Sequence, residues 1–319
     1  MPIRLSVYQG MILGGLVCLL MTGCSPADCG GRADGFSPAL RGKYFGQKAP
    51  GRVPQAFAPS VLPIAGVQHC FPTFDRSGKE VYWMNFNLET RKGVIMTMKV
   101  EQGCWTSPQV APFSGEHNDH SPVFSRDGKR LYFVSARPGG YGRGDIWYLQ
   151  RTGTGWSAPQ NLGSPPNSER SDIQPSFTRD GTLYFTSELE GSQWNLGIYR
   201  SRWVDGRYQP PEVLGSLINT AGADYTPFIA PDESYLLFAS SRPGTHSVET
   251  DLYISFHNDD DSWTQPLNMG EAINNGYSVS FPWLSLDEKF LFFDRFNDST
   301  DAFYWVDSRI IAELRSAQH

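Results

Sequence analysis

Several familiar signatures of enzymes are missing from this chain of 319 residues. There is no G-x-S-x-G nucleophile elbow, no H-E-x-x-H metal motif, no phosphate-binding loop and no dinucleotide fingerprint. A peptidase, a nucleotidase or a dehydrogenase is therefore unsupported. Charged residues make up only 19% of the chain, its net charge is −6 and the sequence shows no basic patch, which argues against nucleic acid as a partner.

The chain also lacks an apolar run long enough to span a membrane, because the longest, Met11 to Met21, is too short. That run follows Arg4 and precedes Leu20-Met21-Thr22-Gly23-Cys24, which resembles a bacterial lipobox. We predict that residues 1–24 are a lipoprotein signal peptide and that Cys24 is lipidated; the alternative is an ordinary signal peptide with an incidental cysteine. Ser25 after the cysteine favours the outer membrane, and residues 25–51 are predicted to be a flexible tether.

Cysteine is scarce, and none of the five lies in a C-x-x-C metal or redox motif. Loss of Cys18 with the signal and use of Cys24 for lipid leave Cys29, Cys70 and Cys104. A disulfide can form in an oxidising envelope, and the pair within the first repeat, Cys70 with Cys104, is the one we favour. The odd number leaves the pairing among these three open.

The chain repeats one unit five times, and its clearest copy runs from Ser121 to Tyr148. In that copy Asp127-Gly128 indicates a tight hairpin turn, and the aromatic-rich stretch Arg130 to Ser135 indicates a strand covered on both faces. Each unit opens with a proline, and the gaps between the prolines are 50, 53, 52 and 55 residues: Pro72, Pro122, Pro175, Pro227 and Pro282. Four short strands in a unit of this length are typical of a propeller blade.

The fourth strand of a unit is marked by an aromatic residue followed shortly by proline, and this mark occurs four times for five units. The last unit runs instead into residues 307–316, where Asp307 or Ser308 can cap a short helix. The missing strand is expected at the other end of the chain, at Val53 to Phe57. We therefore predict an all-β fold, a five-bladed propeller of four-stranded antiparallel blades over residues 52–319, closed by an N-terminal strand. Six blades would require one within Gly30 to Gly51, which is too short and glycine-rich.

The repeat resembles the TolB-like, WD-related β-propeller repeat, P-x-F-S-x-D-G-K-x-L-Y-F-x-S-x-R-x-G-x-x-D-I-[WY]. Residues Pro122 to Trp147 match it almost throughout, and Pro227 to Tyr253 match it well. The first and fifth units depart from it, with Asn87 in place of the arginine and Asp294-Arg295 in place of Ser-x-Arg. The resemblance implies the propeller fold, but the family includes envelope scaffolds, domains fused to peptidases and polysaccharide lyases, and many lipoproteins, so it implies no single function.

One set of polar residues recurs where the first strands should line the central channel. Three positions before the repeated proline stand His69, Asp119, Asp172, Asp224 and Val279. Together with the nearby His120, these residues are the candidate ligand-binding site: His69, Asp119, His120, Asp172 and Asp224. The arginines of two units, Arg137 and Arg242, are expected to pair with Asp145 and Asp251 across a hairpin.

Three interpretations of these acidic residues stay open. Their carboxylates are suited to a divalent cation, or to the acid and base of a glycosidase, with Asp119, Asp172 and Asp224 as the catalytic candidates. Five-bladed propeller glycosidases place acidic residues at such a mouth, a resemblance of geometry alone. Alternatively, the same residues bond backbone amides and hold neighbouring blades in register, a structural role that their recurrence at one repeat position favours.

These observations lead us to expect a non-enzymatic binding or scaffold module that engages a protein or a glycan. We expect a monomer in the bacterial cell envelope, attached to the outer membrane only through its lipid and facing the periplasm or the surface. The alternative is a carbohydrate-active enzyme, a glycoside hydrolase or polysaccharide lyase, that uses Asp119, Asp172 and Asp224 with His69 or His120.

Overall fold

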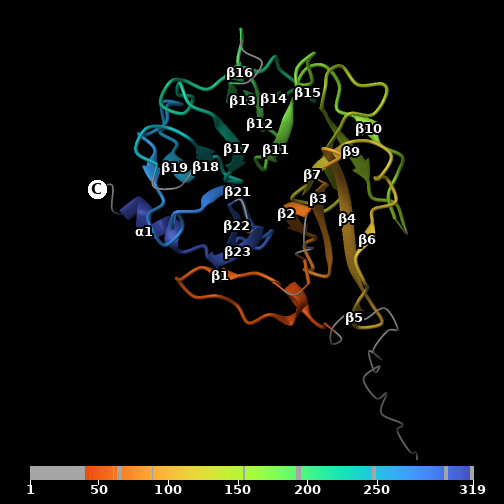
Figure 1. Cartoon of the computed structure of the whole chain (residues 1–319). Coiled ribbons are helices and arrows are strands. Elements are labelled where there is room, and N and C mark those ends of the chain that lie inside the picture. The colour runs from red at the N-terminus through yellow and green to blue at the C-terminus, as the bar shows by residue number, and fades with distance from the viewer. Residues whose placement is uncertain are drawn as a thin grey trace, which may run out of the picture.

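Five four-stranded antiparallel blades surround a central channel in the computed structural model of this protein (Figure 1). The structure describes residues 40–316 except 60, 63–66, 88, 154, 192–194, 246–248 and 298–300, and only the backbone of residues 67–71. The predicted signal peptide and Cys24 lie outside the described residues. The predicted five-bladed propeller is confirmed.

Each blade is a meander whose first strand lies innermost. The first blade contains β2 (Val67–Phe74), β3 (Glu80–Asn87), β4 (Lys92–Glu101), β5 (Cys104–Trp105) and β6 (Gln109–Val110). The second contains β7 (Asp119–Phe124), β8 (Arg130–Ser135), β9 (Asp145–Gln150) and β10 (Gln160–Asn161). The third contains β11 (Ile173–Phe177), β12 (Leu183–Glu188), β13 (Leu196–Ser201) and β16 (Glu212–Val213), with an added hairpin of β14 (Trp203–Val204) and β15 (Arg207–Tyr208).

The fourth blade contains β17 (Asp224–Ile229), β18 (Tyr235–Ser240), β19 (Asp251–Phe256) and β20 (Leu267–Asn268). The fifth contains β21 (Ser278–Leu284), β22 (Phe290–Phe296) and β23 (Asp301–Asp307). Its outer strand is β1 (Gln55–Ala56), which pairs antiparallel with β23. The Phe57 amide also donates to the Phe303 carbonyl at 2.7 Å. The N-terminal strand thus closes the ring, as the sequence predicts.

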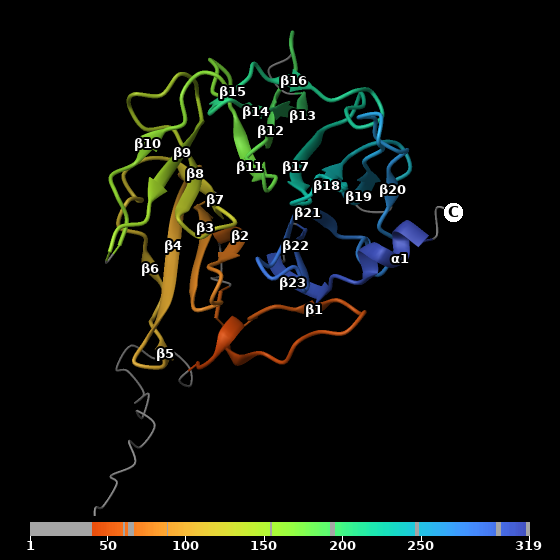
Figure 2. The ribbon, with the colours of Figure 1, turned by 180° about the vertical axis from the view of Figure 1, so that it is seen from behind.

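Residues on either side of the repeats pack against the ring. The 3₁₀ turn η1 (Lys43–Gly46) places Tyr44 and Phe45 in the aromatic core between the first and last blades, and the Trp105 indole donates to the Gly42 carbonyl at 2.9 Å. Residues 40–51, part of the predicted tether, therefore contact the folded domain, as Figure 2 shows from behind. At the other end, α1 (Ile310–Ser316) begins three residues later than residue 307, where the helix is predicted to start, and it buries Ile311.

The blades are held together by hydrogen bonds between inner strands. The residues before four of the repeated prolines, Ser121, Gln174, Thr226 and Phe281, all adopt positive φ at a break in strand register. This bulge changes the direction of the backbone. Side chains of one blade then accept hydrogen bonds from backbone amides of the next blade, as the Ser176 hydroxyl does from the Ile229 amide at 2.9 Å.

We call the end where the inner strands begin the front face, and the end with the turns between first and second strands the turn face. Among the described residues no helix is long and apolar enough to cross a membrane.

Candidate functional site

The three repeated aspartates lie at the front face, each at the start of its blade's inner strand. Asp119, Asp172 and Asp224 are at most 1% exposed. The Oδ1 atom of each accepts a hydrogen bond from a serine at the end of the second strand, Ser135, Ser187 and Ser240 respectively, at 2.6, 2.7 and 2.5 Å. The Oδ2 atom of each accepts a hydrogen bond at 2.8 Å from a hydroxyl group of the preceding loop, that of Ser114, Ser168 and Thr220 respectively. All three carboxylates therefore tie the loop between blades to the blade that follows.

Two of the three aspartates also form an ion pair with an arginine. Arg137 Nη2 lies 3.0 Å from Asp119 Oδ1, and Arg242 Nη2 lies 3.0 Å from Asp224 Oδ1. The expected pairing of these arginines with Asp145 and Asp251 is therefore wrong. Asp145 instead accepts the amides of its own hairpin loop, Tyr141 and Gly142, at 2.7 and 2.9 Å.

The arginines fill the front end of their blades as well as neutralising a carboxylate. The Arg137 guanidinium lies 4.8 Å from the Phe133 ring centre and donates to the Phe113 carbonyl. In the fourth blade the Arg242 guanidinium lies over Phe238 and Tyr253, at 5.0 and 4.8 Å, and donates to carbonyls of the preceding loop. Each arginine is thus enclosed by an aromatic pair, an aspartate and loop carbonyls.

The last blade also has an arginine enclosed by an aromatic pair and loop carbonyls, but this arginine stands at a different position of the repeat. Val279 replaces the aspartate, and Arg295, directly opposite it in the strand register, supplies the guanidinium. This guanidinium lies 5.2 Å from Phe293 and 4.3 Å from Tyr304 and donates to the Ile273 carbonyl at 3.0 Å. An arginine therefore fills the front of the second, fourth and fifth blades.

The third blade keeps the aspartate and the aromatic pair but not the arginine. Leu189 stands two residues after Ser187, where the arginines of the second and fourth blades stand two residues after Ser135 and Ser240. Its side chain packs over Gly197, where an added Cβ would lie 2.5 Å from a Leu189 methyl carbon. A larger residue at position 197 would displace the Leu189 side chain, so Gly197 leaves the space in which that leucine lies.

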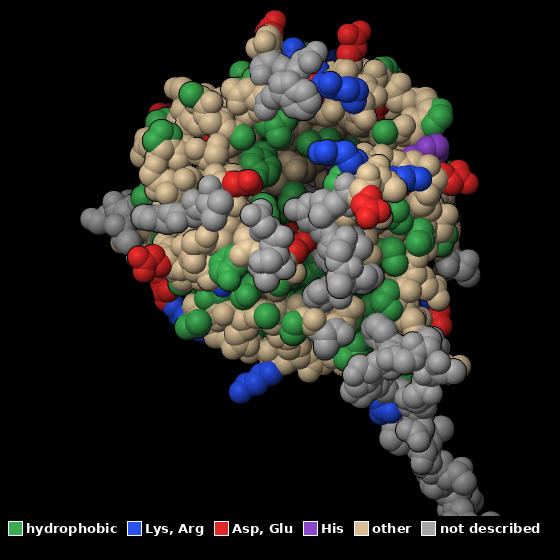
Figure 3. Space-filling model, viewed as in Figure 1, with side chains coloured by type: hydrophobic (Ala, Val, Ile, Leu, Met, Phe, Trp, Pro, Cys, Tyr) green, Lys and Arg blue, Asp and Glu red, His purple; other side chains and the backbone are tan. Residues whose placement is uncertain are grey.

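A cavity of about 440 Å³ lies in the third blade where the arginine is missing, and its walls include Asp172, Ser187, Phe185 and Tyr199. Figure 3 shows a hollow over this blade, with hydrophobic side chains inside it and Lys or Arg side chains at its edge. The rings of Phe185 and Tyr199 are stacked with centres 5.8 Å apart, close to the 6.3 Å of Phe238 and Tyr253. The aromatic pair is therefore in place, and the third blade lacks both the arginine and the aspartate that the second and fourth blades carry there, with Leu189 and Gly197 at those positions.

Asp172 differs electrostatically from an ordinary surface carboxylate. Burial raises its pKa above the usual 3.8, the nearby Asp145 carboxylate adds to the rise, and hydrogen bonds from Ser187 and Ser168 offset part of it. Within the described residues, Ser187 is the one donor to Asp172 Oδ1, whereas Asp119 and Asp224 each receive a serine and an arginine there. Asp172 lines the cavity, and its raised pKa favours the protonated form that a general acid needs.

Two further charged groups line the same cavity. Glu169 is exposed and supplies a second carboxylate. Arg170 donates a hydrogen bond to the Glu188 carbonyl at 3.0 Å. In the part of the chain that is described, it makes no hydrogen bond to Asp172. The cavity thus combines a buried acid, a solvent-accessible carboxylate, a cation and two aromatic rings.

The remaining predicted site residues contribute less. His120 is partly buried, its Nδ1 lies 2.9 Å from the Ser121 hydroxyl, and desolvation lowers its pKa to about 4, so it is neutral at pH 7. His69 lies in β2 opposite Asn85, and its side chain is outside the described residues. Among the described side chains, no three of His, Cys, Asp or Glu are placed to hold a metal ion.

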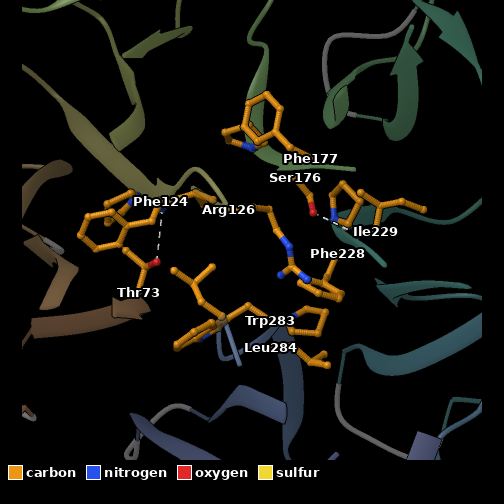
Figure 4. Close-up of a pocket in the computed structure, with 15 residues that line it drawn as sticks. Thr73, Phe124, Arg126, Ser176, Phe177, Phe228, Ile229, Trp283 and Leu284 are labelled. Carbon is orange, nitrogen blue, oxygen red and sulfur yellow. Dashed lines mark hydrogen bonds between the residues drawn. The ribbon is translucent and has the colours of Figure 1, made fainter. Parts of the chain in front are cut away.

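The central channel at the turn face is narrow and apolar. Its cavity of about 60 Å³ is lined by the repeated prolines and the residues after them, including Phe124, Phe228 and Trp283. Figure 4 shows the Arg126 side chain reaching across this space toward Phe228. Nothing larger than a few water molecules fits here, so the front cavity is the better candidate for a substrate site.

Comparisons with known proteins identify the fold. No family model matches the chain, and no curated protein matches it in sequence. Solved structures do match: an endo-arabinase from Bacteroides thetaiotaomicron with a TM-score of 0.52 and 15% identity, covering 77% of this chain and 96% of that chain. A GH62 hydrolase in complex with xylotriose has a TM-score of 0.51 and 14% identity, covering 82% and 98%. A thermostable family-43 glycoside hydrolase also has a TM-score of 0.51 and 14% identity, covering 77% and 90%.

The expectation of a non-enzymatic scaffold is corrected by these comparisons. By their titles these three solved structures are an endo-arabinase, a GH62 hydrolase and a family-43 glycoside hydrolase, so the fold of this chain is one that carbohydrate-active enzymes use. At 14 to 15% identity the likeness itself shows the fold, so activity has to be argued from this chain's own residues.

Proposed function

We propose that this protein is a carbohydrate-active enzyme, a glycoside hydrolase in which Asp172 is the proton donor. The observation that carries the proposal is the contrast among the three repeated aspartates. Asp119 and Asp224 are neutralised by arginines, whereas Asp172 faces a cavity and has a raised pKa. A raised pKa favours the protonated carboxyl, which is the form that donates a proton to a glycosidic oxygen.

The residues around the cavity have complementary roles in this reaction. Asp172 transfers its proton to the glycosidic oxygen as the bond from that oxygen to the anomeric carbon breaks. The Glu169 carboxylate takes a proton from the water that adds to the anomeric carbon. The partly exposed Tyr199 ring, backed by the buried Phe185, provides apolar surface for a sugar, and Arg170 at the wall can donate hydrogen bonds to sugar hydroxyls.

The test is turnover of polysaccharides, including arabinans and xylo-oligosaccharides, followed by the release of reducing ends. Asp172→Asn should lower kcat by about 10² to 10⁴-fold, the usual contribution of a general acid, while the protein stays folded. Asp224→Asn is the matched control, because Asp224 occupies the same repeat position but is sealed by Arg242. It should lower stability and leave the turnover of the folded protein unchanged.

Two outcomes would contradict the proposal. One is an absence of product from the wild-type protein on every polysaccharide. The other is an equal loss of turnover in folded Asp172→Asn and folded Asp224→Asn, which would show that the repeated aspartates act only through the fold.

We propose that the enzyme works in the cell envelope as a lipid-anchored member of the TolB-like repeat proteins. The lipobox before Cys24 and the repeat Pro122 to Trp147 support this location. Cys104 is disulfide-bonded, as suits an oxidising compartment; the side chain of its predicted partner Cys70 lies outside the described residues. Labelling with a radioactive fatty acid should mark the wild-type protein and not Cys24→Ala, and label retained in that variant would refute the anchor.

A further inference from the structure

A second, larger cleft lies on the turn face, at the opposite end of the blades from Asp172. Asp172 directly precedes β11, whereas Thr178, Arg179 and Gly181 follow that strand and line the cleft. Its volume is about 620 Å³, and it borders the turn end of the central channel, with which it shares Arg126 and Phe177. We call it the turn-face cleft.

The turn-face cleft is strongly cationic in a chain whose net charge is −6. Two carboxylates line it, Asp127 and Glu288, against five cationic side chains: Arg76, Arg126, Lys129, Arg130 and Arg179. Three of them, Arg126, Lys129 and Arg130, come from one turn, and the ring brings Arg76 and Arg179 to them from the turns of the neighbouring blades. The expectation that the protein lacks a basic patch is therefore wrong for the folded chain.

The positive charges of the turn-face cleft are incompletely neutralised. Arg126 forms an ion pair with Glu288. Burial lowers the pKa of Arg126, Glu288 offsets part of this effect, and the neighbouring Arg179 and Arg76 lower the pKa further. Arg76 and Arg179 form no ion pair with a carboxylate in the described part of the chain. Cations held close together in this way favour an anionic ligand.

An exposed aromatic surface borders the same cleft. The third blade carries an added hairpin, β14–β15, which brings Trp203 and Tyr208 to the cleft wall. Trp203 is 38% exposed, stands edge-to-face against Tyr208 at 4.7 Å, and lies over Gly181, where an added Cβ would be 3.4 Å from the indole. The hairpin therefore holds an indole at the surface, and such flat, accessible rings are suited to stacking on a sugar.

We propose that the turn-face cleft binds an acidic polysaccharide. A sugar ring rests on Trp203, and the carboxylate or sulfate groups of the chain pair with Arg76, Arg126 and Arg179. Neither the aromatic surface nor the cations alone would select this ligand, because aromatic rings also bind neutral glycans and cations also bind other polyanions. The site is distinct from the front cavity and needs no catalysis, so it would hold the enzyme on an anionic glycan while the front face works.

The test is binding of polygalacturonate to the mature chain by calorimetry, with neutral xylan for comparison. The double variant Arg76→Glu with Arg179→Glu should bind at least about tenfold more weakly, because charge-assisted contacts become repulsive. Trp203→Ala should weaken binding with little change in its salt dependence. The matched control, Lys48→Glu with Arg91→Glu, changes the net charge equally at exposed positions outside the cleft and should bind as the wild type does.

The outcomes separate this proposal from its rivals and from the enzymatic proposal. Equal loss of binding in the cleft and control variants would overturn the proposal, since net charge alone would then explain binding. Tighter binding of single-stranded DNA or of vesicles rich in anionic lipid than of polygalacturonate would overturn it as well. Asp172→Asn should bind polygalacturonate normally, so failure of the enzymatic proposal leaves this result intact.

Discussion

The fourth and third blades share an aspartate, a serine and an aromatic pair at their front ends but differ at two positions, where Arg242 and Asp251 of the fourth blade are Leu189 and Gly197 in the third. In the fourth blade Arg242 lies between the Asp224 carboxylate and the Phe238–Tyr253 pair. In the third, Asp172, Phe185 and Tyr199 remain in place around a cavity of about 440 Å³. A repeat protein can therefore create a chemically distinct site by omitting a residue that its other repeats use to fill their cores.

The comparison also shows why recurrence alone is a poor guide to function. Recurrence of the aspartate at one repeat position correctly indicates a structural role, since all three carboxylates bind a loop hydroxyl and a strand serine. The functional candidate is the copy whose surroundings break the repeat. Burial raises its pKa and the Asp145 carboxylate adds to the rise, and no arginine donates a hydrogen bond to the Asp172 carboxylate in the described part of the chain.

The largest effect on stability is expected from converting the fourth blade into the third. Arg242→Leu would open the front of that blade and leave the buried Asp224 carboxylate without its cation. Breaking such a buried pair should lower the free energy of unfolding by about 3 to 5 kcal/mol, measured by urea denaturation. Arg202→Leu is the control: this arginine is 41% exposed in its ion pairs, and its loss should cost about 1 kcal/mol or less. Similar losses in both variants would refute the idea that the arginine is a core element.

The reverse exchange should have a somewhat smaller effect of opposite sign. Leu189→Arg would place a guanidinium between Asp172 and the Phe185–Tyr199 pair and fill the cavity. The gain should be about 1.5 to 3 kcal/mol, the range for a hydrogen bond to a charged group, and turnover should be lost because Asp172 becomes a paired carboxylate. Leu189→Met, which keeps the cavity, is the control for the change at this position. An arginine variant that keeps full turnover would contradict the assignment of the cavity.

The smallest expected effect is a pH dependence of stability. The folded-state pKa of Asp172 is raised above 3.8, so the folded protein binds its proton more tightly than the unfolded chain does. Its contribution to stability is greatest below pH 3.8 and is lost as the pH rises through the raised pKa. Denaturation across this range should show the wild type losing stability relative to Asp172→Asn with rising pH, and parallel curves would argue against a raised pKa.

Much of the fold follows from the sequence because its determinants are local and repeated. The spacing of the prolines, the Asp-Gly turns and the unpaired last unit suffice to predict the blades and the strand that closes them. The partners of Arg137 and Arg242 could not be predicted, because each guanidinium crosses its blade to an aspartate that lies 18 residues earlier.

Both candidate sites depend on information that the repeat pattern does not display directly. The front cavity had one sequence signal: Leu189 stands in the third unit where Arg137 and Arg242 stand in the second and fourth. The turn-face cleft had almost none, since its cations come from separate turns that the closed ring brings together. The exposed indole of Trp203 likewise reaches the cleft only through the folded β14–β15 hairpin.

The most direct test of the account is the titration of the Asp172 carboxyl group, followed by nuclear magnetic resonance of carbon-13-labelled aspartate in the wild type and in Leu189→Arg. We predict that Asp172 titrates above the ordinary range for aspartate in the wild type, and that its pKa falls once the guanidinium occupies the cavity. An Asp172 that titrates at or below the ordinary value in the wild type would contradict its assignment as the proton donor.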